Sequence, residues 1–238
     1  MAECRIGRRW WTQRRGVGHI DRNGRTRWQS APHGASVDQT GLVSTSIAFF
    51  IFDDAEELDW VGPWEVLAAW GQGWPDDGVT TFTVAQTGGP VRCAKGLRVL
   101  PDYSWDTAPA FDVLIYPGGA GTRPHVGDPS IRQWVGHQAE NRTLIASVCT
   151  GSLVLADNGL LDGLPATTHW GSLGLLASLG TDIEVRPNDR FVDTGQVVTA
   201  AGVSAGIDMA LHLVARLHSV ERAREVRRYI QYDPEPPI

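Results

Sequence analysis

Cys149 has the surroundings that a nucleophilic side chain needs. It lies between an apolar stretch, residues 144–148, and a segment with helical character, and Ser147 and Gly151 place small residues two positions before and after it. A strand–nucleophile–helix turn of the nucleophile-elbow type is so tight that bulky residues at those positions would clash. A thiol at a helix N-terminus also meets the positive end of the helix dipole, so we expect its pKa to be lowered. The alternative for a lone cysteine is a buried structural role.

Asp59 is the candidate acid or base. Five carboxylates crowd residues 53–59, and most carboxylates at such a junction cap a helix or favour its dipole. Asp59 differs because Leu58 and Trp60 flank it, an arrangement that would place it in an apolar pocket and raise its pKa. A carboxyl group that titrates near neutral pH suits general acid or base catalysis.

Two glycines and one histidine are candidate substrate-binding residues. Gly118 and Gly119 follow a short apolar stretch, and glycines there permit positive φ and close approach of backbone N–H groups to a ligand. Together with the N–H of Thr150, the N–H of Gly119 could form an oxyanion-hole-like pocket. His169 could orient the site or assist a proton transfer, and a hydrogen-bonded structural histidine fits the sequence equally well. The remaining histidines lack metal-ligand spacing, so we predict no metal site.

Short apolar strands that alternate with helices must position these residues. The predicted strands are 46–52, 79–85, 96–100, 112–116, 143–148, 190–193 and 196–200, and the predicted helices are 58–70, 129–141, 150–158, 204–217 and 220–229. This alternation indicates one α/β domain around a mostly parallel sheet. Ligands bind beyond the carboxyl ends of the strands in such sheets. The stretch 53–59, the turn at Gly118 and Gly119, and Cys149 all fall at such ends.

Composition excludes several classes of protein. The longest apolar run, residues 47–52, is too short to cross a bilayer. Three widely spaced cysteines argue against a disulfide scaffold and for a reducing compartment, so we expect a cytoplasmic protein with no membrane partner. Residues 45–238 carry 13 basic and 24 acidic side chains. Because phosphate repels so acidic a body, we expect no nucleic-acid partner.

Residues 1–44 differ from the rest of the chain. They hold eight arginines against three acidic residues and show no apolar periodicity. We predict a basic, disordered leader before a single domain at 45–238. An export signal, a nucleic-acid-binding tail and a start codon assigned too early are further interpretations; the first lacks the apolar stretch that such a signal needs.

Several motifs together resemble the ThiJ/PfpI branch of the class I glutamine-amidotransferase-like superfamily. They lie between residues 46 and 238, in the order Leu58-Asp59-x-x-Gly62-Pro63-x-Glu65-Val66-Leu67, Pro117-Gly118-Gly119-Ala120-Gly121, Ser147-Val148-Cys149-Thr150-Gly151-Ser152, Ala166-Thr167-Thr168-His169-Trp170 and Ala205-Gly206-Ile207-Asp208. The resemblance implies a flavodoxin-like three-layer α/β sandwich with a mostly parallel sheet and a nucleophile elbow. It also implies a homodimer that acts on a small molecule without a metal or organic cofactor.

Within this branch the sequence is most similar to the isonitrile hydratases, which add water to an isonitrile to give an N-substituted formamide. The resemblance implies that Cys149 is the nucleophile, Thr150 its assisting neighbour and Asp59 the acid. Protease-like members have a histidine where this chain has Thr150, which counts against peptidase activity. Two alternatives stay open: a regulatory domain that binds a small molecule without turnover, and a cysteine enzyme acting on oxoaldehydes or glycated groups.

Overall fold

The computed structural model describes residues 43–234 without interruption, and the pairs 19–20, 26–27 and 36–37. The chain separates into two compact units, residues 1–32 and 33–238. In the first unit the described residues form an antiparallel pair, β1 (His19–Ile20) with β2 (Thr26–Arg27). Most of the leader predicted at residues 1–44 lies outside the described residues and stays a prediction.

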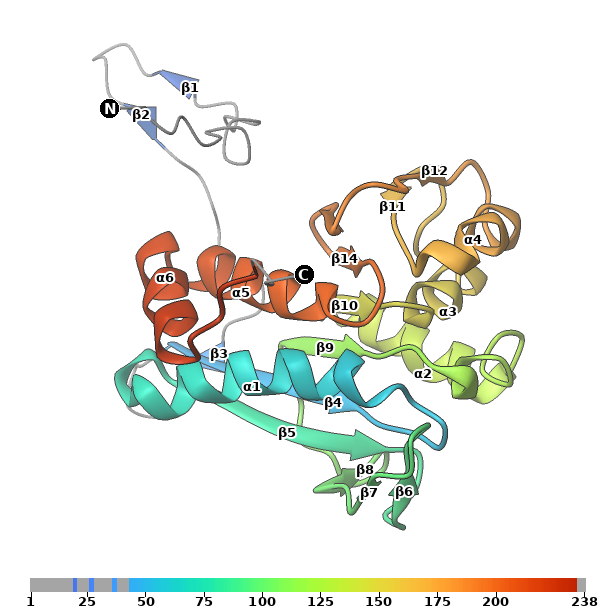
Figure 1. The fold of residues 1–238 in the computed structure, drawn as a ribbon, viewed down its shortest axis with the longest axis horizontal. Coiled ribbons are helices and arrows are strands. Elements are labelled where there is room, and N and C mark those ends of the chain that lie inside the picture. The colour runs from blue at the N-terminus through green and yellow to red at the C-terminus, as the bar shows by residue number, and fades with distance from the viewer. Residues whose placement is uncertain (1–18, 21–25, 28–35, 38–42, 235–238) are drawn as a thin grey trace, which may run out of the picture. The chain divides into compact units, whose positions relative to one another are not determined.

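The second unit is built on an eight-stranded sheet (Figure 1). In sheet order the strands are β13 (Phe191–Asp193), β14 (Val197–Ala200), β10 (Leu144–Val148), β9 (Val113–Tyr116), β4 (Val43–Phe50), β5 (Val79–Ala85) and β8 (Tyr103–Ser104), with β3 (Ser36–Val37) also pairing to β4. Neighbours pair in parallel from β14 to β8, and only β13 and β3 pair antiparallel. The predicted mostly parallel sheet is confirmed.

Helices cover both faces of this sheet. The helices are α1 (Glu57–Gly73), α2 (Pro129–Glu140), α3 (Gly151–Asp157), α4 (Leu173–Leu179), α5 (Ala205–Leu217) and α6 (Val220–Tyr229). Buried side chains of α1, α5 and α6 belong to one apolar cluster, and those of α2, α3 and α4 belong to the other. The result is the flavodoxin-like three-layer sandwich that the sequence predicted.

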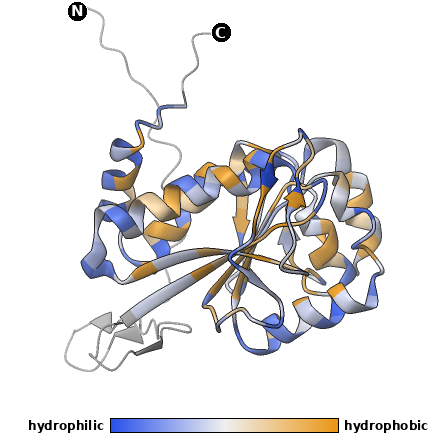
Figure 2. Cartoon of the chain, turned by 90° about the horizontal axis from the view of Figure 1, so that it is seen from below, coloured by the Kyte–Doolittle hydropathy of each residue, from blue (hydrophilic) through white to orange (hydrophobic). Residues whose placement is uncertain are grey.

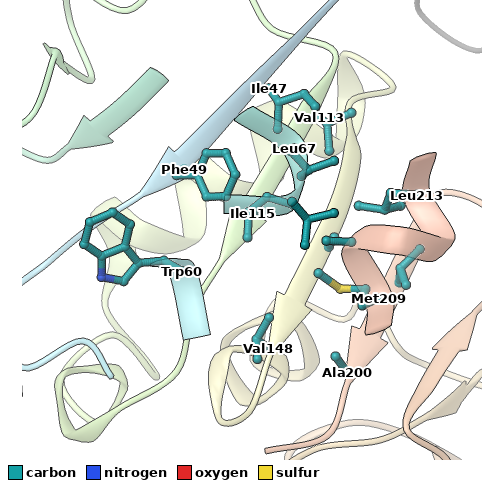
Figure 3. Close-up of a cluster of buried hydrophobic side chains, with 14 of the residues drawn as sticks. Ile47, Phe49, Trp60, Leu67, Val113, Ile115, Val148, Ala200, Met209 and Leu213 are labelled. Atoms are coloured by element: carbon teal, nitrogen blue, oxygen red, sulfur yellow. The ribbon is translucent and has the colours of Figure 1, made fainter. Parts of the chain in front are cut away.

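Alternation along the central strands builds both apolar layers. In β4, Ile47 and Phe49 pack on the α1 and α5 side, whereas Ala48 and Phe50 pack on the opposite side. Figure 3 shows the first of these layers, with Trp60 and Leu67 of α1 and Met209 and Leu213 of α5 around strand residues such as Ile115. Strands that are buried on both faces appear in a sequence as continuous apolar runs, and such runs predicted the central strands of this sheet. Figure 2 shows that apolar residues concentrate in these central strands.

Short peripheral elements differ from the sequence prediction. The strand predicted at 96–100 is only β7 (Arg98–Val99), which pairs with β6 (Val91–Arg92) in a separate two-stranded sheet. Its flanking apolar residues do not enter the core, since Leu97 and Leu100 are 45% and 69% exposed. Helix α4 and the parallel pair β11 (Pro165–Ala166) and β12 (Glu184–Val185) were not predicted. Among the described residues, no helix is both long and apolar enough to cross a membrane.

Candidate active site

Cys149 occupies a tight turn between β10 and α3. Its φ is +56°, a left-handed conformation that is uncommon outside glycine, and its N–H donates to the carbonyl oxygens of Ala200 and Ala201 at 3.1 and 3.0 Å. A Cβ added at Gly151 would lie 2.4 Å from the carbonyl oxygen of Tyr116. The small residue after the nucleophile is therefore a steric requirement, and the predicted elbow geometry is present. Such backbone strain is characteristic of functional sites.

The backbone N–H groups of Thr150 and Val203 lie near the Cys149 sulfur, where they favour the thiolate and act to lower the pKa of the thiol. Val203 follows β14 and has φ of +48°, which is a genuine outlier for a β-branched residue. Its strained backbone thus contributes a hydrogen-bond donor to the site. Sequence reasoning missed Val203 because its contribution comes from the main chain, which no residue type reveals.

Asp59 lies in the first turn of α1 and is completely buried. Its Oδ2 accepts a 2.9 Å hydrogen bond from the Gly118 N–H. Its Oδ1 is buried and has no N–H or O–H partner among the described residues. The Cys149 thiol is a further neighbour that interacts with this carboxyl. The pKa of Asp59 is raised to about 7, mainly by burial; the Gly118 hydrogen bond opposes this rise, and the negative charge of Glu56 contributes to it. The buried, high-pKa carboxyl predicted from sequence is confirmed.

The pKa of Cys149 differs from the prediction. Burial, and then the negative charge of Asp59, raise the pKa of this thiol to about 12, and the N–H donors of Thr150 and Val203 only partly oppose the rise. The predicted lowering by the helix dipole is wrong, because a side chain that is 6% exposed and faces a carboxylate loses more by desolvation and repulsion than α3 returns. At neutral pH the Cys149 side chain is therefore a neutral thiol that lies beside the Asp59 carboxyl.

Gly118 and Gly119 hold catalytic candidates in place. The Gly118 N–H donates to Asp59, and the Gly119 N–H donates to Thr150 Oγ1 at 3.0 Å. A Cβ at Gly118 would lie 2.5 Å from Thr150 N, 2.7 Å from Thr150 Oγ1 and 2.8 Å from Asp59 Oδ2. Three polar atoms therefore converge on one glycine. Both amides bond to protein side chains here, which differs from the open oxyanion pocket that we expected.

His169 lies at the rim of this site. It is half-buried, and its Nδ1 accepts a 3.2 Å hydrogen bond from the N–H of Gly171. Its ring lies against Gly202, where a Cβ would come within 2.6 Å of His169 Cδ2. No hydrogen bond between His169 and Cys149 or Asp59 is found within the described part of the chain. The observed contact is local, as expected of a structural histidine.

Two buried threonines join the site without having been predicted. Thr168 Oγ1 donates to the Cys149 carbonyl oxygen at 2.8 Å, and Thr122 Oγ1 lies 3.0 Å from Thr150 Oγ1. Thr168 lies within the motif at residues 166–170 and Thr122 directly follows the motif at residues 117–121, but only the folded chain shows that these threonines lie close to Cys149 and Thr150. In the described segments no cluster of three or more His, Cys, Asp or Glu side chains is placed to hold a metal ion.

The sequence profile of the DJ-1/PfpI family matches residues 45–216, which include the elbow and Asp59. The chain belongs to the DJ-1/PfpI family. A solved DJ-1/PfpI-type structure, described as a ThiJ/PfpI family protein from Pseudomonas syringae, superimposes with a TM-score of 0.74 at 31% identity, covering 83% of this chain and 78% of that one.

Two similar proteins illustrate different functions among the relatives of this chain. An isonitrile hydratase of Pseudomonas putida is 38% identical over 196 residues, which are 82% of each protein. The HTH-type transcriptional regulator GbdR of Pseudomonas aeruginosa is 32% identical over 156 residues, which are 63% of this chain and 41% of the regulator. The family thus contains both enzymes and regulators, so membership alone does not choose between turnover and binding.

Proposed function

We propose that this protein is a cysteine-dependent isonitrile hydratase, which converts an isonitrile and water to an N-substituted formamide. The observation that carries the proposal is the buried Asp59 carboxyl, with its pKa raised to about 7, beside the Cys149 thiol. A carboxyl group with such a pKa can both accept and donate a proton at neutral pH. The similarity to the hydratase of Pseudomonas putida over most of both chains supports the same reaction.

The first half of the reaction adds the thiol to the isonitrile carbon. The Cys149 sulfur forms a bond to that carbon while its proton passes to the Asp59 carboxylate. Asp59 then returns the proton to the same carbon, whose lone pair accepts it. The product is a thioimidate, formed without a leaving group. Because the thiol and the carboxyl share one proton above the pKa of Asp59, the pair supplies nucleophile and acid together.

The second half adds water. Asp59 takes a proton from the attacking water as its oxygen bonds to the thioimidate carbon, and the substrate nitrogen receives that proton. The carbon–sulfur bond then breaks, the hydroxyl proton returns to sulfur through Asp59, and the formamide leaves. The cycle thus ends with the Cys149 thiol and the Asp59 carboxylate in the forms in which they began. Dividing one hard addition into two easier additions is the advantage of a covalent intermediate.

A ligand-binding function without turnover is the second candidate, favoured by the similarity to GbdR. Both functions would use the same fold and the same surroundings of Cys149. They differ in whether the Cys149–Asp59 pair forms and breaks a bond to the ligand.

An assay for formamide separates these functions. The full chain is incubated with an alkyl isonitrile, and the product is followed by NMR, with methylglyoxal and a peptide as parallel substrates. We expect formamide from the wild type and none from Cys149→Ser, which should keep its fold because one small side chain replaces another. An isonitrile that binds but is recovered unchanged would favour the regulatory function, and consumption of methylglyoxal alone would favour the oxoaldehyde alternative.

A further inference from the structure

Thr122 is a completely buried hydroxyl that none of the reaction steps above uses. Its Oγ1 lies 2.8 Å from the Gly119 carbonyl oxygen and 3.0 Å from Thr150 Oγ1. It belongs to η2 (Ala120–Thr122), directly after the glycine turn. One hydroxyl has only one proton, so it can donate to only one of these two acceptors at a time.

Each choice of acceptor sets the direction of the Thr150 proton. When Thr122 donates to the Gly119 carbonyl, Thr122 Oγ1 is free to accept, and the Thr150 hydroxyl can point back at it. When Thr122 donates to Thr150, that oxygen already accepts from the Gly119 N–H, so both of its acceptor positions are filled. The Thr150 proton is then left for the Gly119 carbonyl, at a long 3.2 Å, or for a ligand.

The Gly119 carbonyl tolerates this change because it has another donor. Arg123 Nη1 donates to it at 3.1 Å. When Thr122 turns toward Thr150, the carbonyl keeps the Arg123 hydrogen bond, so no buried acceptor is left unpaired. Thr122 and Thr150 are 0% and 4% exposed, so little water competes for either hydroxyl.

We propose that Thr122 is a positioning residue that directs the Thr150 hydroxyl proton toward the substrate nitrogen. This inference rests on the proposed function. Thr150 Oγ1, Thr150 N and Asp59 Oδ2 all lie within 2.8 Å of the point where a Gly118 Cβ would be, so the hydroxyl is beside the proton-transferring carboxyl. Thr150 also directly follows Cys149 in the chain, which keeps the same residue close to the side chain that carries the intermediate.

The second half of the reaction is where this donor matters. As the oxygen of water bonds to the thioimidate carbon, the electron pair of the C=N bond moves to nitrogen. Asp59 carries the proton from water and delivers it there. A hydrogen bond from Thr150 stabilises the negative charge on nitrogen until that proton arrives, in the manner of an oxyanion-hole donor. Attack of sulfur on the isonitrile carbon puts no negative charge on nitrogen, so the first half needs the donor less.

Thr122→Val tests the inference, because valine keeps the shape and removes the hydroxyl. We expect kcat for isonitrile hydration to fall about tenfold or more, less than the 10²–10³ that follows loss of a direct donor. We expect KM to fall or stay unchanged, since the second half becomes rate-limiting. Intact-mass spectrometry after quenching should show an adduct on Cys149 with the full mass of the isonitrile, more abundant than in the wild type. Thr122→Ser should restore kcat and remove the adduct.

Thr143→Val is the matched control, since Thr143 is similarly buried at the opposite end of β10. It should leave kcat and the adduct level at wild-type values. A wild-type kcat in Thr122→Val, or equal losses in Thr122→Val and Thr122→Ser, would overturn the positioning role while leaving the hydratase function in place. A wild type that yields neither formamide nor adduct would overturn the hydratase function, and this inference with it.

Discussion

At the scale of single residues, Cys149 and Asp59 behave as one chemical unit. Burial raises the pKa of both groups; the negative charge of Asp59 raises the pKa of the Cys149 thiol further, and a hydrogen bond from that thiol lowers the pKa of Asp59. The pair therefore loses its first proton near pH 7 and keeps the second until high pH. In the proposed mechanism the catalytic form is the one-proton form, so the reaction does not require a permanent Cys149 thiolate.

Asp59→Asn should uncouple nucleophilicity from turnover. Removing the negative charge beside Cys149 lowers the thiol pKa, so iodoacetamide at pH 8 should alkylate Cys149 faster than in the wild type. Turnover should nevertheless fall by about two to four orders of magnitude, since the proton carrier is lost. Both measurements use a Cys4→Ser/Cys93→Ser background in which only Cys149 reacts. Asp157→Asn, at the far end of α3, is the control and should change neither rate. Slower alkylation in Asp59→Asn would contradict the coupling.

The same carboxyl predicts opposite effects of pH on activity and stability. Activity requires ionised Asp59, so kcat/KM should fall about tenfold per pH unit below about 7. The folded pKa lies above the unfolded value of about 3.9, so the native state holds an extra proton between these values and stability falls as pH rises through this window. Relative to wild type, Asp59→Asn should thus gain thermal stability, more at pH 8 than at pH 5, by at most about 4 kcal/mol. An equal difference at both pH values would contradict the assigned pKa.

At the scale of elements, the site is assembled where the strands end. β9 leads to the glycine turn, β10 to Cys149 and β14 to Val203, and the parallel register brings these three strand ends to one edge of the sheet. Helix α1 approaches that edge with its first turn and brings Asp59. The turn at Gly118 connects α1 with the Cys149 turn, because the Gly118 N–H donates to Asp59 and the Gly118 Cα faces Thr150.

Gly118→Ala should therefore disturb the site more than the fold. The added Cβ would lie 2.5 Å from Thr150 N and 2.8 Å from Asp59 Oδ2, so the turn must move away from the carboxyl. We expect kcat to drop at least about a hundredfold, as for other losses of site geometry. Gly136→Ala, where a Cβ meets nothing within 4 Å on α2, should keep full activity and gain a little stability. Comparable activity in the two variants would show that the turn tolerates a side chain.

These elements show which parts of the site the sequence could predict. Continuous apolar runs predicted the central strands, and the small residues around Cys149 predicted the tight turn. Both predictions were possible because each feature depends on residues that are close in sequence. Asp59 was predictable because its neighbours are apolar. The Cys149 pKa was mispredicted since burial depends on α1 and the loop after β14, which are distant in sequence. Thr122 was missed for the same reason: its partner Thr150 is 28 residues away.

At the scale of the whole molecule, the C-terminal helix braces the helix that carries Asp59. Asp77 ends the short 3₁₀ helix η1 (Pro75–Asp77) that follows α1, and it accepts hydrogen bonds from Trp70 Nε1 of α1 and from Arg222 Nε of α6, each at 2.6 Å. The Arg222 guanidinium also lies 4.7 Å from the centre of the Trp74 ring, a cation–π contact. α6 thus contacts α1 as well as α5. All of the contacts given for the site lie between residues 43 and 234.

Deleting residues 1–42 should therefore leave both folding and catalysis intact. The deletion ends where β4 begins, at Val43. The described residues that it removes are β1, β2 and the short edge strand β3, and none of these takes part in the contacts around Cys149 and Asp59. We expect kcat/KM to stay within about twofold of the full chain and thermal stability to change little, as for surface changes in general. Deleting residues 1–47 is the matched comparison. It removes the positions of β4 that pair with Val79, Thr80 and Thr81 in the middle of the sheet, so it should unfold the protein. An insoluble or inactive protein after deletion of residues 1–42 would contradict this prediction, because it would show that residues 43–238 need the basic segment for folding or activity.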